Sequence, residues 1–170
     1  ASSNFSPIPL IICKDIGKMK RIILIIWREM QMNKHIYIFD GDGTIIDSSH
    51  RGLSNADGSI NLEHWKENST PQQIAKDKLL PLYYYCVFLK EQGHRLIFCT
   101  ARELGKGDHQ FFIRHNFHKI FDRIISRPIG DTTADHILKA KQLQYLFNLK
   151  WAKDKPKFFY DDNAFNRKAL

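Results

Sequence analysis

Four short apolar segments recur along the chain, and polar residues follow each of them. They are residues 36–39, 95–99, 123–126 and 157–160. Such runs of β-branched and aromatic residues are too short for helices and are typical of buried strands. Segments with helical spacing separate them, so the pattern predicts an α/β fold with a parallel sheet.

Helix-start and helix-stop signals mark the segments between these strands. Thr70 and Pro71 suit an N-cap and a first helical position, and Gln73 completes a capping box. Further helices are expected at residues 81–93, 108–117 and 137–147. Residues 45–70 are instead polar and rich in turn residues, which predicts a small flap rather than a large lid.

The composition of the chain is that of an ordinary globular domain. The 170 residues are 43% hydrophobic, enough for the core of one domain. Cys13, Cys86 and Cys99 are widely spaced, so we expect neither a disulfide framework nor a zinc site, and the reducing cytoplasm is the expected compartment. The net charge of +8 is only a weak argument for a polyanionic partner.

The first 31 residues differ from the rest of the chain. The apolar run Ile22–Trp27 is far shorter than the roughly 20 residues that span a bilayer. No small-residue cleavage site follows it, so neither a membrane anchor nor a signal peptide is expected. We expect residues 1–31 to be a leader, a cloning-derived segment or translated upstream sequence, with a short extra helix as the alternative.

The domain itself is expected over residues 32–170, beginning at Met32. The chain lacks an initiating Met and ends eight residues after its last acidic pair, Asp161-Asp162. Truncation at the C-terminus is therefore expected as well.

The strongest chemical signal is a pair of aspartates, Asp40 and Asp42, directly after the first predicted strand. In open α/β sheets, binding groups lie beyond the carboxyl ends of the strands. Two carboxylates crowded there repel each other unless a cation intervenes, and Mg²⁺ prefers oxygen ligands. A simple turn is the alternative interpretation. A calcium loop is rejected, because Thr44 and Arg51 stand where an EF-hand needs an acidic or amide residue and a glutamate.

Polar residues that could belong to the same site also follow two other predicted strands. Thr100 and Arg102 follow the second strand, and a guanidinium there suits a bidentate contact with phosphate oxygens. Asp161 and Asp162 follow the last strand. Since the carboxyl ends of parallel strands lie at one edge of a sheet, these groups are expected near Asp40.

A lysine on the last long helix is the candidate cation of this site. Asp135 and Lys139 lie four residues apart and so share a helix face. An ordinary exposed ion pair is one interpretation, and a cation that offsets charge on a nucleophile and a phosphate is the other. Lys141 competes for this role, and we favour Lys139 because Asp135 would orient it.

These features occur in the order that is found in the haloacid dehalogenase (HAD) superfamily of phosphoryl-transfer enzymes, which the chain resembles. The resemblance implies a three-layer Rossmann-like sheet with helices on both faces and a minimal cap. It implies that Asp40 is the nucleophile, that Asp42 is the general acid and base, and that Thr100 and Lys139 bind the phosphoryl group. It also implies a Mg²⁺ site made by Asp40, the backbone carbonyl of Asp42, Asp161 and Asp162.

Within that superfamily the chain most resembles the phosphatase domain of the phage polynucleotide kinase–3′-phosphatases, over residues 36–166. The likeness rests on Asp-x-Asp-Gly-Thr, on Thr100-Ala101-Arg102 and on Arg127 before Gly130-Asp131-Thr132. It implies a substrate site formed by Arg51, Arg102, Arg127 and Asp135. A solvated loop arginine is the alternative interpretation of Arg51. Gly41 and Thr100 depart from the family, which has a bulkier apolar residue and a serine there, but neither change removes a catalytic group.

Three functions are compatible with these patterns. The first is a Mg²⁺-dependent polynucleotide 3′-phosphatase in nucleic-acid repair, acting on a nucleic-acid 3′ end through an aspartyl-phosphate. The second is a small-molecule phosphatase for a nucleotide or a sugar, and the third is a non-catalytic nucleic-acid-binding module. The chain contains no Gly-x-x-x-x-Gly-Lys-Ser/Thr loop, so no kinase half is expected in it.

Overall fold

The structure is a computed structural model that describes residues 20–21, 23–25, 34–57 and 60–169. The chain divides into two units, residues 1–33 and 34–170. In the first unit, residues 20–21 and 23–25 are helical and their side chains are exposed. The other residues of the expected leader lie outside the described residues, so its origin stays a prediction.

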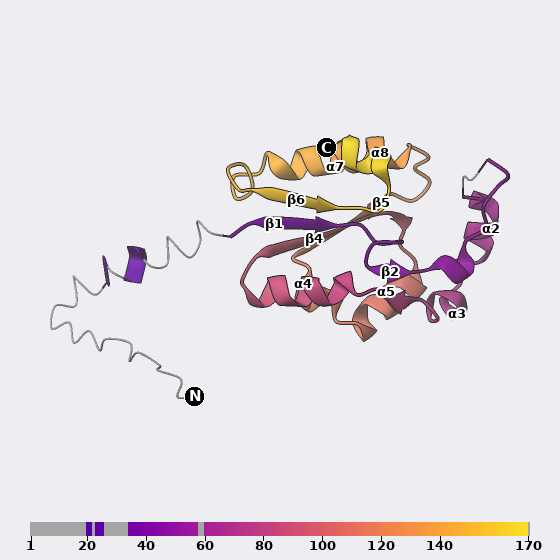
Figure 1. The fold of residues 1–170 in the computed structure, drawn as a ribbon, viewed down its shortest axis with the longest axis horizontal. Coiled ribbons are helices and arrows are strands. Elements are labelled where there is room, and N and C mark those ends of the chain that lie inside the picture. The colour runs from indigo at the N-terminus through magenta and orange to yellow at the C-terminus, as the bar shows by residue number, and fades with distance from the viewer. Residues whose placement is uncertain (1–19, 22, 26–33, 58–59, 170) are drawn as a thin grey trace, which may run out of the picture. The chain divides into compact units, whose positions relative to one another are not determined.

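A four-stranded parallel sheet lies at the centre of the second unit (Figure 1). In spatial order its strands are β5 (Arg123–Arg127), β4 (Arg95–Glu103), β1 (Ile36–Phe39) and β6 (Lys157–Tyr160). Because β1 pairs in parallel with both β4 and β6, the predicted parallel α/β sheet is confirmed. β4 runs further than expected, so Thr100 and Arg102 lie within this strand and not after it.

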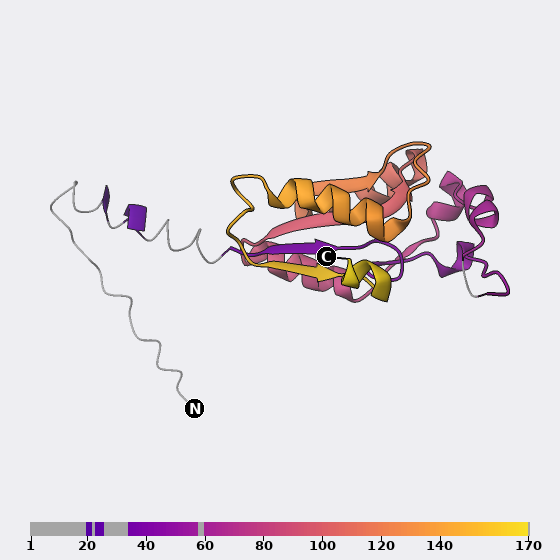
Figure 2. The ribbon, with the colours of Figure 1, turned by 90° about the horizontal axis from the view of Figure 1, so that it is seen from above.

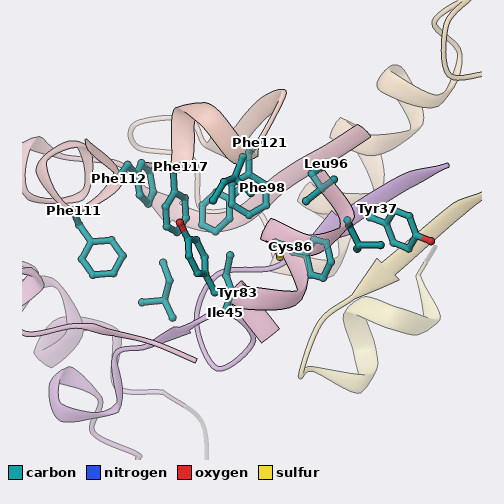
Figure 3. Close-up of a cluster of buried hydrophobic side chains, with 14 of the residues drawn as sticks. Tyr37, Ile45, Tyr83, Cys86, Leu96, Phe98, Phe111, Phe112, Phe117 and Phe121 are labelled. Carbon is teal, nitrogen blue, oxygen red and sulfur yellow. The ribbon is translucent and has the colours of Figure 1, made fainter. Parts of the chain in front are cut away.

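The side chains of β1 alternate between two cores, one on each face of the sheet. Tyr37 and Phe39 belong to the larger core, which also contains Phe98 and Phe117 (Figure 3). Ile36 and Ile38 belong to the smaller core on the other face. Successive side chains of a strand point to opposite faces, so both cores fix the register of β1. Asp40, which follows β1 directly, is held by this register.

Helices cover both faces of the sheet and complete the three layers (Figures 1 and 2). One face carries α4 (Leu82–Glu91), α5 (Lys106–Arg114) and α6 (Phe117–Ile120). The other face carries α7 (Asp135–Phe147), with α8 (Ala164–Lys168) against it. This arrangement confirms the predicted helix layers.

The helix expected over residues 108–117 is in fact two helices. Asn116 has a left-handed φ of 57°, which interrupts the helix between α5 and α6. α5 begins at Lys106, earlier than expected, and Asp108 is its third residue. The carboxylate of Asp108 accepts a hydrogen bond from the Gly105 backbone N–H at 2.9 Å, so it caps the helix from inside.

The insertion between β1 and α4 forms the flap, which contains five short elements. They are β2 (Ile46–Asp47), the 3-10 helix η1 (Ser49–Arg51), α2 (Leu62–Glu67), α3 (Pro71–Ile74) and β3 (Lys78–Leu79). β2 and β3 pair antiparallel, so the flap extends to residue 79 and not to 70. Thr70 accepts a hydrogen bond from the Gln73 N–H at 3.3 Å, which confirms it as the α3 N-cap.

The flap lies at the end of the sheet toward which β1 and β6 point (Figure 2). α3 packs closely against α5 at Gly107, where a β-carbon would lie 2.8 Å from the Pro71 Cα atom. A side chain at position 107 would therefore push the flap away from the sheet domain. Among the described residues, no helix is long and apolar enough to cross a membrane. Cys86 and Cys99 are buried and are not in disulfide bonds.

Candidate active site

Lys139 joins the carboxyl ends of β1 and β6. Its ammonium lies 2.6 Å from Asp40 Oδ1 and 2.7 Å from Asp161 Oδ2, and the residue is 2% exposed. α7 carries Lys139 on its sheet-facing side, next to the buried Leu138, whereas Lys141 is exposed. The geometry therefore favours Lys139 over Lys141. It is oriented by Asp40 and Asp161, since Asp135, which was expected to orient it, pairs with Arg127.

Three carboxylates form a single acidic cluster around this lysine. One oxygen from each of Asp40, Asp161 and Asp162 lies within 4.8 Å of the others. One ammonium offsets only part of that charge, so the cluster is suited to a divalent cation with oxygen ligands. Asn166 donates to both oxygens of Asp161, while its own buried Oδ1 atom has no hydrogen-bond partner among the described residues. The oxygen atoms of these three carboxylates fit Mg²⁺ as ligands.

The two acidic loops are fastened to each other at Gly43 and Thr44. The Asp162 backbone N–H donates to Thr44 Oγ1 at 3.1 Å. Gly43 has a φ of +73°, and a β-carbon on it would collide with Asp162 Oδ2. Only glycine combines this left-handed backbone with so close an approach of the carboxylate. The glycine after Asp42 thus allows Asp162 to reach the cluster.

The electrostatics of the cluster favour added positive charge. Burial raises the pKa of Asp40 to about 7; the neighbouring Asp161 raises it too, while Lys139 opposes the rise. Burial and Asp161 also raise the pKa of Asp162. Burial would lower the pKa of Lys139, but its two aspartate partners raise it above the usual value, so the ammonium stays charged.

Asp42 points to a different set of partners from Asp40. Both of its oxygens accept from Arg102, with Nε 2.8 Å from Oδ2, and Ser48 donates to Oδ1. Burial alone would raise the pKa of Asp42, but the Arg102 guanidinium holds that pKa below its usual range. The Asp42 carboxylate is therefore charged, oriented and separate from the cluster of acidic side chains.

Arg51 and Arg102 are buried, which the sequence did not indicate. Arg51 is 1% exposed. It donates hydrogen bonds to the Asp77 carboxylate from Nε at 3.0 Å and from Nη2 at 2.8 Å. Arg102 donates to Asp108 at 2.7 Å and to Asp77 at 3.2 Å. Trp65 lies over Arg51 at 4.4 Å. The interpretation of Arg51 as a solvated loop arginine is wrong.

Sequence reasoning missed Asp77, the carboxylate that joins these two arginines. It stands alone between Lys76 and Lys78 in a polar segment, where an acidic residue usually means a solvated loop. Nothing in its spacing from Arg51 or Arg102 marks it as their partner. Contacts between residues 25 or more positions apart carry no local sequence signal.

Arg127 and Asp135 meet each other beside the end of β4. Arg127 donates through Nε to the Ala101 carbonyl at 2.7 Å and pairs with the Asp135 carboxylate. Its Nη1 atom donates to the carbonyls of Asp131 and Thr133. These contacts fasten the loop after β5 to the strand that carries Thr100 and Arg102.

Thr100 lies beside the Asp40 loop, where the HAD resemblance requires a hydroxyl. A β-carbon on Gly41 would be 3.2 Å from Thr100 Oγ1 and 3.0 Å from the ring of Phe98. Phe98 therefore fills the space that the expected bulkier residue at position 41 would take. This contact explains why glycine is accommodated there.

The sequence matches, over residues 27–166, a family described as Bacteriophage T5 5′-deoxynucleotidase. The chain belongs to this family. The 5′-deoxynucleotidase of Escherichia phage T5 itself is 28% identical over 145 residues, which cover 83% of this chain and 59% of the relative. The chain thus spans about three fifths of the length of that curated relative.

Solved structures confirm the HAD-like fold of this family member. A haloacid dehalogenase-like hydrolase from Streptococcus pneumoniae superposes with a TM-score of 0.59 at 14% identity, covering 80% of this chain and 79% of that chain. A HAD-superfamily hydrolase from Geobacter sulfurreducens gives 0.52 at 13% identity, covering 80% and 81%. The predicted HAD resemblance is confirmed, and the matched family names a deoxynucleotidase where the sequence led us to expect a polynucleotide 3′-phosphatase.

The fit between Gly43 and Asp162 gives a prediction about cation binding. Gly43→Ala should destabilise the protein by about 1–2 kcal/mol through left-handed strain and also weaken Mg²⁺ binding, because the methyl group displaces Asp162. Gly130→Ala is the matched control, since Gly130 has a φ of +76° and open space around its Cα atom. Calorimetric Mg²⁺ titration of both variants checks this. Equal affinities in the two variants would contradict the role given to the Asp162 contact.

The raised pKa of Asp40 predicts how stability depends on pH in EDTA. The folded state retains a proton between about pH 4, the ordinary aspartate pKa, and about pH 7. Asp40 therefore lowers the free energy of unfolding as the pH rises through that window. The melting temperature of Asp40→Asn relative to that of the unsubstituted protein should therefore be higher at pH 7.5 than at pH 4.5. A difference in melting temperature between the two proteins that is the same at pH 4.5 and at pH 7.5 would refute this.

Proposed function

We propose that this protein hydrolyses deoxynucleoside 5′-monophosphates in a Mg²⁺-dependent reaction with Asp40 as the nucleophile. The convergence of Lys139, Asp40, Asp161 and Asp162 at the carboxyl ends of β1 and β6 is the observation that carries this proposal. Membership of the 5′-deoxynucleotidase family supplies the substrate class. The full relative is longer than this chain, so the activity is proposed here for the chain as it stands.

Asp40 is the attacking carboxylate in this proposal. Its oxygen displaces the nucleoside 5′-oxygen from phosphorus and forms an aspartyl-phosphate, which water then cleaves. Lys139 is bonded to Asp40 and lies where negative charge accumulates, so it stabilises both displacements electrostatically. Asp40, Asp161 and Asp162 would hold Mg²⁺, which when bound neutralises the charge of the phosphoryl oxygens.

Asp42 and Thr100 complete the reaction centre. Asp42 would protonate the leaving 5′-oxygen and later accept a proton from the attacking water. The first transfer starts from the protonated carboxyl and leaves it charged. The charged form, which pairs with Arg102 in this structure, then takes a proton from the water and so restores the acid. The Thr100 hydroxyl lies beside Gly41 and would donate to a phosphoryl oxygen.

The arginines support a small substrate over a polynucleotide 3′ end. Arg51 and Arg102 are buried and direct most of their N–H groups at Asp77, Asp42 and Asp108. A polynucleotide backbone is usually bound by exposed cations that can replace its counterions. The two arginines that were expected to bind substrate are therefore better suited to shaping the site. A soluble nucleotide also agrees with the expected cytoplasmic location, which stays a prediction.

A substrate panel tests this function. Deoxynucleoside 5′-monophosphates should be hydrolysed with the highest kcat/KM, ahead of ribonucleotides, a sugar phosphate and a 3′-phosphorylated oligonucleotide. EDTA should abolish activity, and Asp40→Asn should lower it by about a thousand-fold or more because the nucleophile is lost. Asp154→Asn removes an exposed carboxylate instead and should leave activity unchanged. Released phosphate is the measured quantity.

Each contrary result has a definite meaning. Faster hydrolysis of the 3′-phosphorylated oligonucleotide would favour the polynucleotide 3′-phosphatase over the deoxynucleotidase. Faster hydrolysis of the sugar phosphate would assign a different small substrate. The lack of Mg²⁺-dependent hydrolysis of every substrate, p-nitrophenyl phosphate included, would favour the non-catalytic nucleic-acid-binding module.

A further inference from the structure

A buried group of charges lies beside the acidic cluster and outside the set of residues that the proposed reaction uses. Its members are Arg51, Arg102, Asp77 and Asp108, and Asp42 forms its edge toward the reaction centre. The first four are between 1% and 8% exposed. Buried charges of this kind are costly unless each one is paired.

Asp77 is the centre of this group. Its Oδ1 atom accepts from Arg51, and its Oδ2 atom accepts from both Arg51 at 2.8 Å and Arg102 at 3.2 Å. The same Arg102 nitrogen, Nη2, also donates to Asp42 Oδ1. A single guanidinium nitrogen therefore connects Asp77 to Asp42.

We propose that Asp77 is a positioning residue for the general acid, because it fixes Arg102 and through Arg102 the carboxylate of Asp42. This inference rests on the proposed function, in which Asp42 transfers the proton. Asp77 does not contact the reacting atoms. It acts through the guanidinium group of Arg102. Because that group is planar, fixing it also fixes the orientation of the Asp42 carboxylate.

Charge balance explains why Asp77 is needed. Arg51 and Arg102 carry like charges, and the carboxylate of Asp77 bonds to both of them. Without that carboxylate the two guanidinium groups repel each other in a buried environment. Arg102 would then shift, and Asp42 would move with it. A displacement of about 1 Å at a reacting group can cost roughly a hundred-fold in rate.

The position of Asp77 also connects the flap to the sheet. Asp77 lies in the flap just before β3, whereas Arg102 lies within β4. Ser48, another flap residue, donates to Asp42 Oδ1, the same oxygen that accepts from Arg102 Nη2. The flap therefore holds Asp42 both directly, through Ser48, and indirectly, through Asp77 and Arg102.

Two aryl phosphates of nearly equal shape test this inference. Phenoxide is a poor leaving group that needs a proton, whereas p-nitrophenoxide leaves without one. The measured quantity is the ratio of kcat/KM for p-nitrophenyl phosphate to kcat/KM for phenyl phosphate. Since kcat/KM reports the step that releases the leaving group, a misplaced general acid raises this ratio. A general loss of folded protein lowers both values equally and leaves the ratio unchanged.

Asp77→Asn in the full chain should raise the ratio by about ten-fold or more, with Asp77→Glu closer to the unsubstituted protein. Asp122→Asn is the matched control and should leave the ratio unchanged. Asp122 also holds a lysine, Lys90, at 2.7 Å and a backbone N–H, that of Leu96, at the opposite end of β4. If Asp77→Asn fails to fold, Asp77→Asn with Arg51→Gln leaves no unpaired arginine at position 51 and should change the ratio in the same direction.

The outcomes separate the inference from the function beneath it. An unchanged ratio in the Asp77 variants, together with a raised ratio in Asp42→Asn, overturns the positioning role alone. An unchanged ratio in Asp42→Asn as well overturns the role of Asp42 as general acid. No hydrolysis of either aryl phosphate or of the deoxynucleoside 5′-monophosphates by the unsubstituted protein overturns the proposed function.

Discussion

The ion pairs of Lys139 with Asp40 and Asp161 are the contacts on which the site depends. They join the ends of two neighbouring strands to a helix on one face of the sheet. A lysine so deeply buried is stable only beside carboxylates, and those carboxylates crowd each other unless a cation is near. The two carboxylates therefore depend on the lysine. Removal of Lys139 would leave them buried without a cation, whereas removal of Asp40 would leave Lys139 paired with Asp161.

The sheet creates this crowding through its topology. β1 lies between β4 and β6, so the loops after three strands distant in sequence meet at one edge. Gly43 then lets the last acidic loop approach the first, and Phe98 fills the space beside Gly41. Next to the cluster, Arg51 and Asp77 of the flap form a second group of charges with Arg102 and Asp108, and this group is more completely paired. The acidic cluster has an excess of negative charge, which suits it to binding a cation. The second group is balanced in charge, which suits it to holding neighbouring residues in place.

Periodic and local patterns in the sequence predicted most of the fold. Apolar runs located all four strands of the main sheet, and Thr70 located the start of α3. The break between α5 and α6 was not predictable, because it depends on a left-handed Asn116 within an otherwise helical pattern. In the site, strand ends and motif order brought out Asp40, Lys139 and Asp161. Asp77 was missed, and the buried state of Arg51 was not foreseen, because both depend on tertiary pairing alone.

If Asp40 is the nucleophile, it becomes phosphorylated during turnover. The most direct measurement is mass spectrometry of the Asp42→Asn protein after acid quenching from a mixture with Mg²⁺ and p-nitrophenyl phosphate. The leaving group of this substrate needs no proton, whereas loss of the base slows cleavage of the intermediate. One phosphoryl group per chain is expected, on the peptide that contains Asp40. A phosphoryl group on any other residue, or turnover by the unsubstituted protein with no phosphorylated enzyme in either form, would contradict the role of Asp40 as nucleophile.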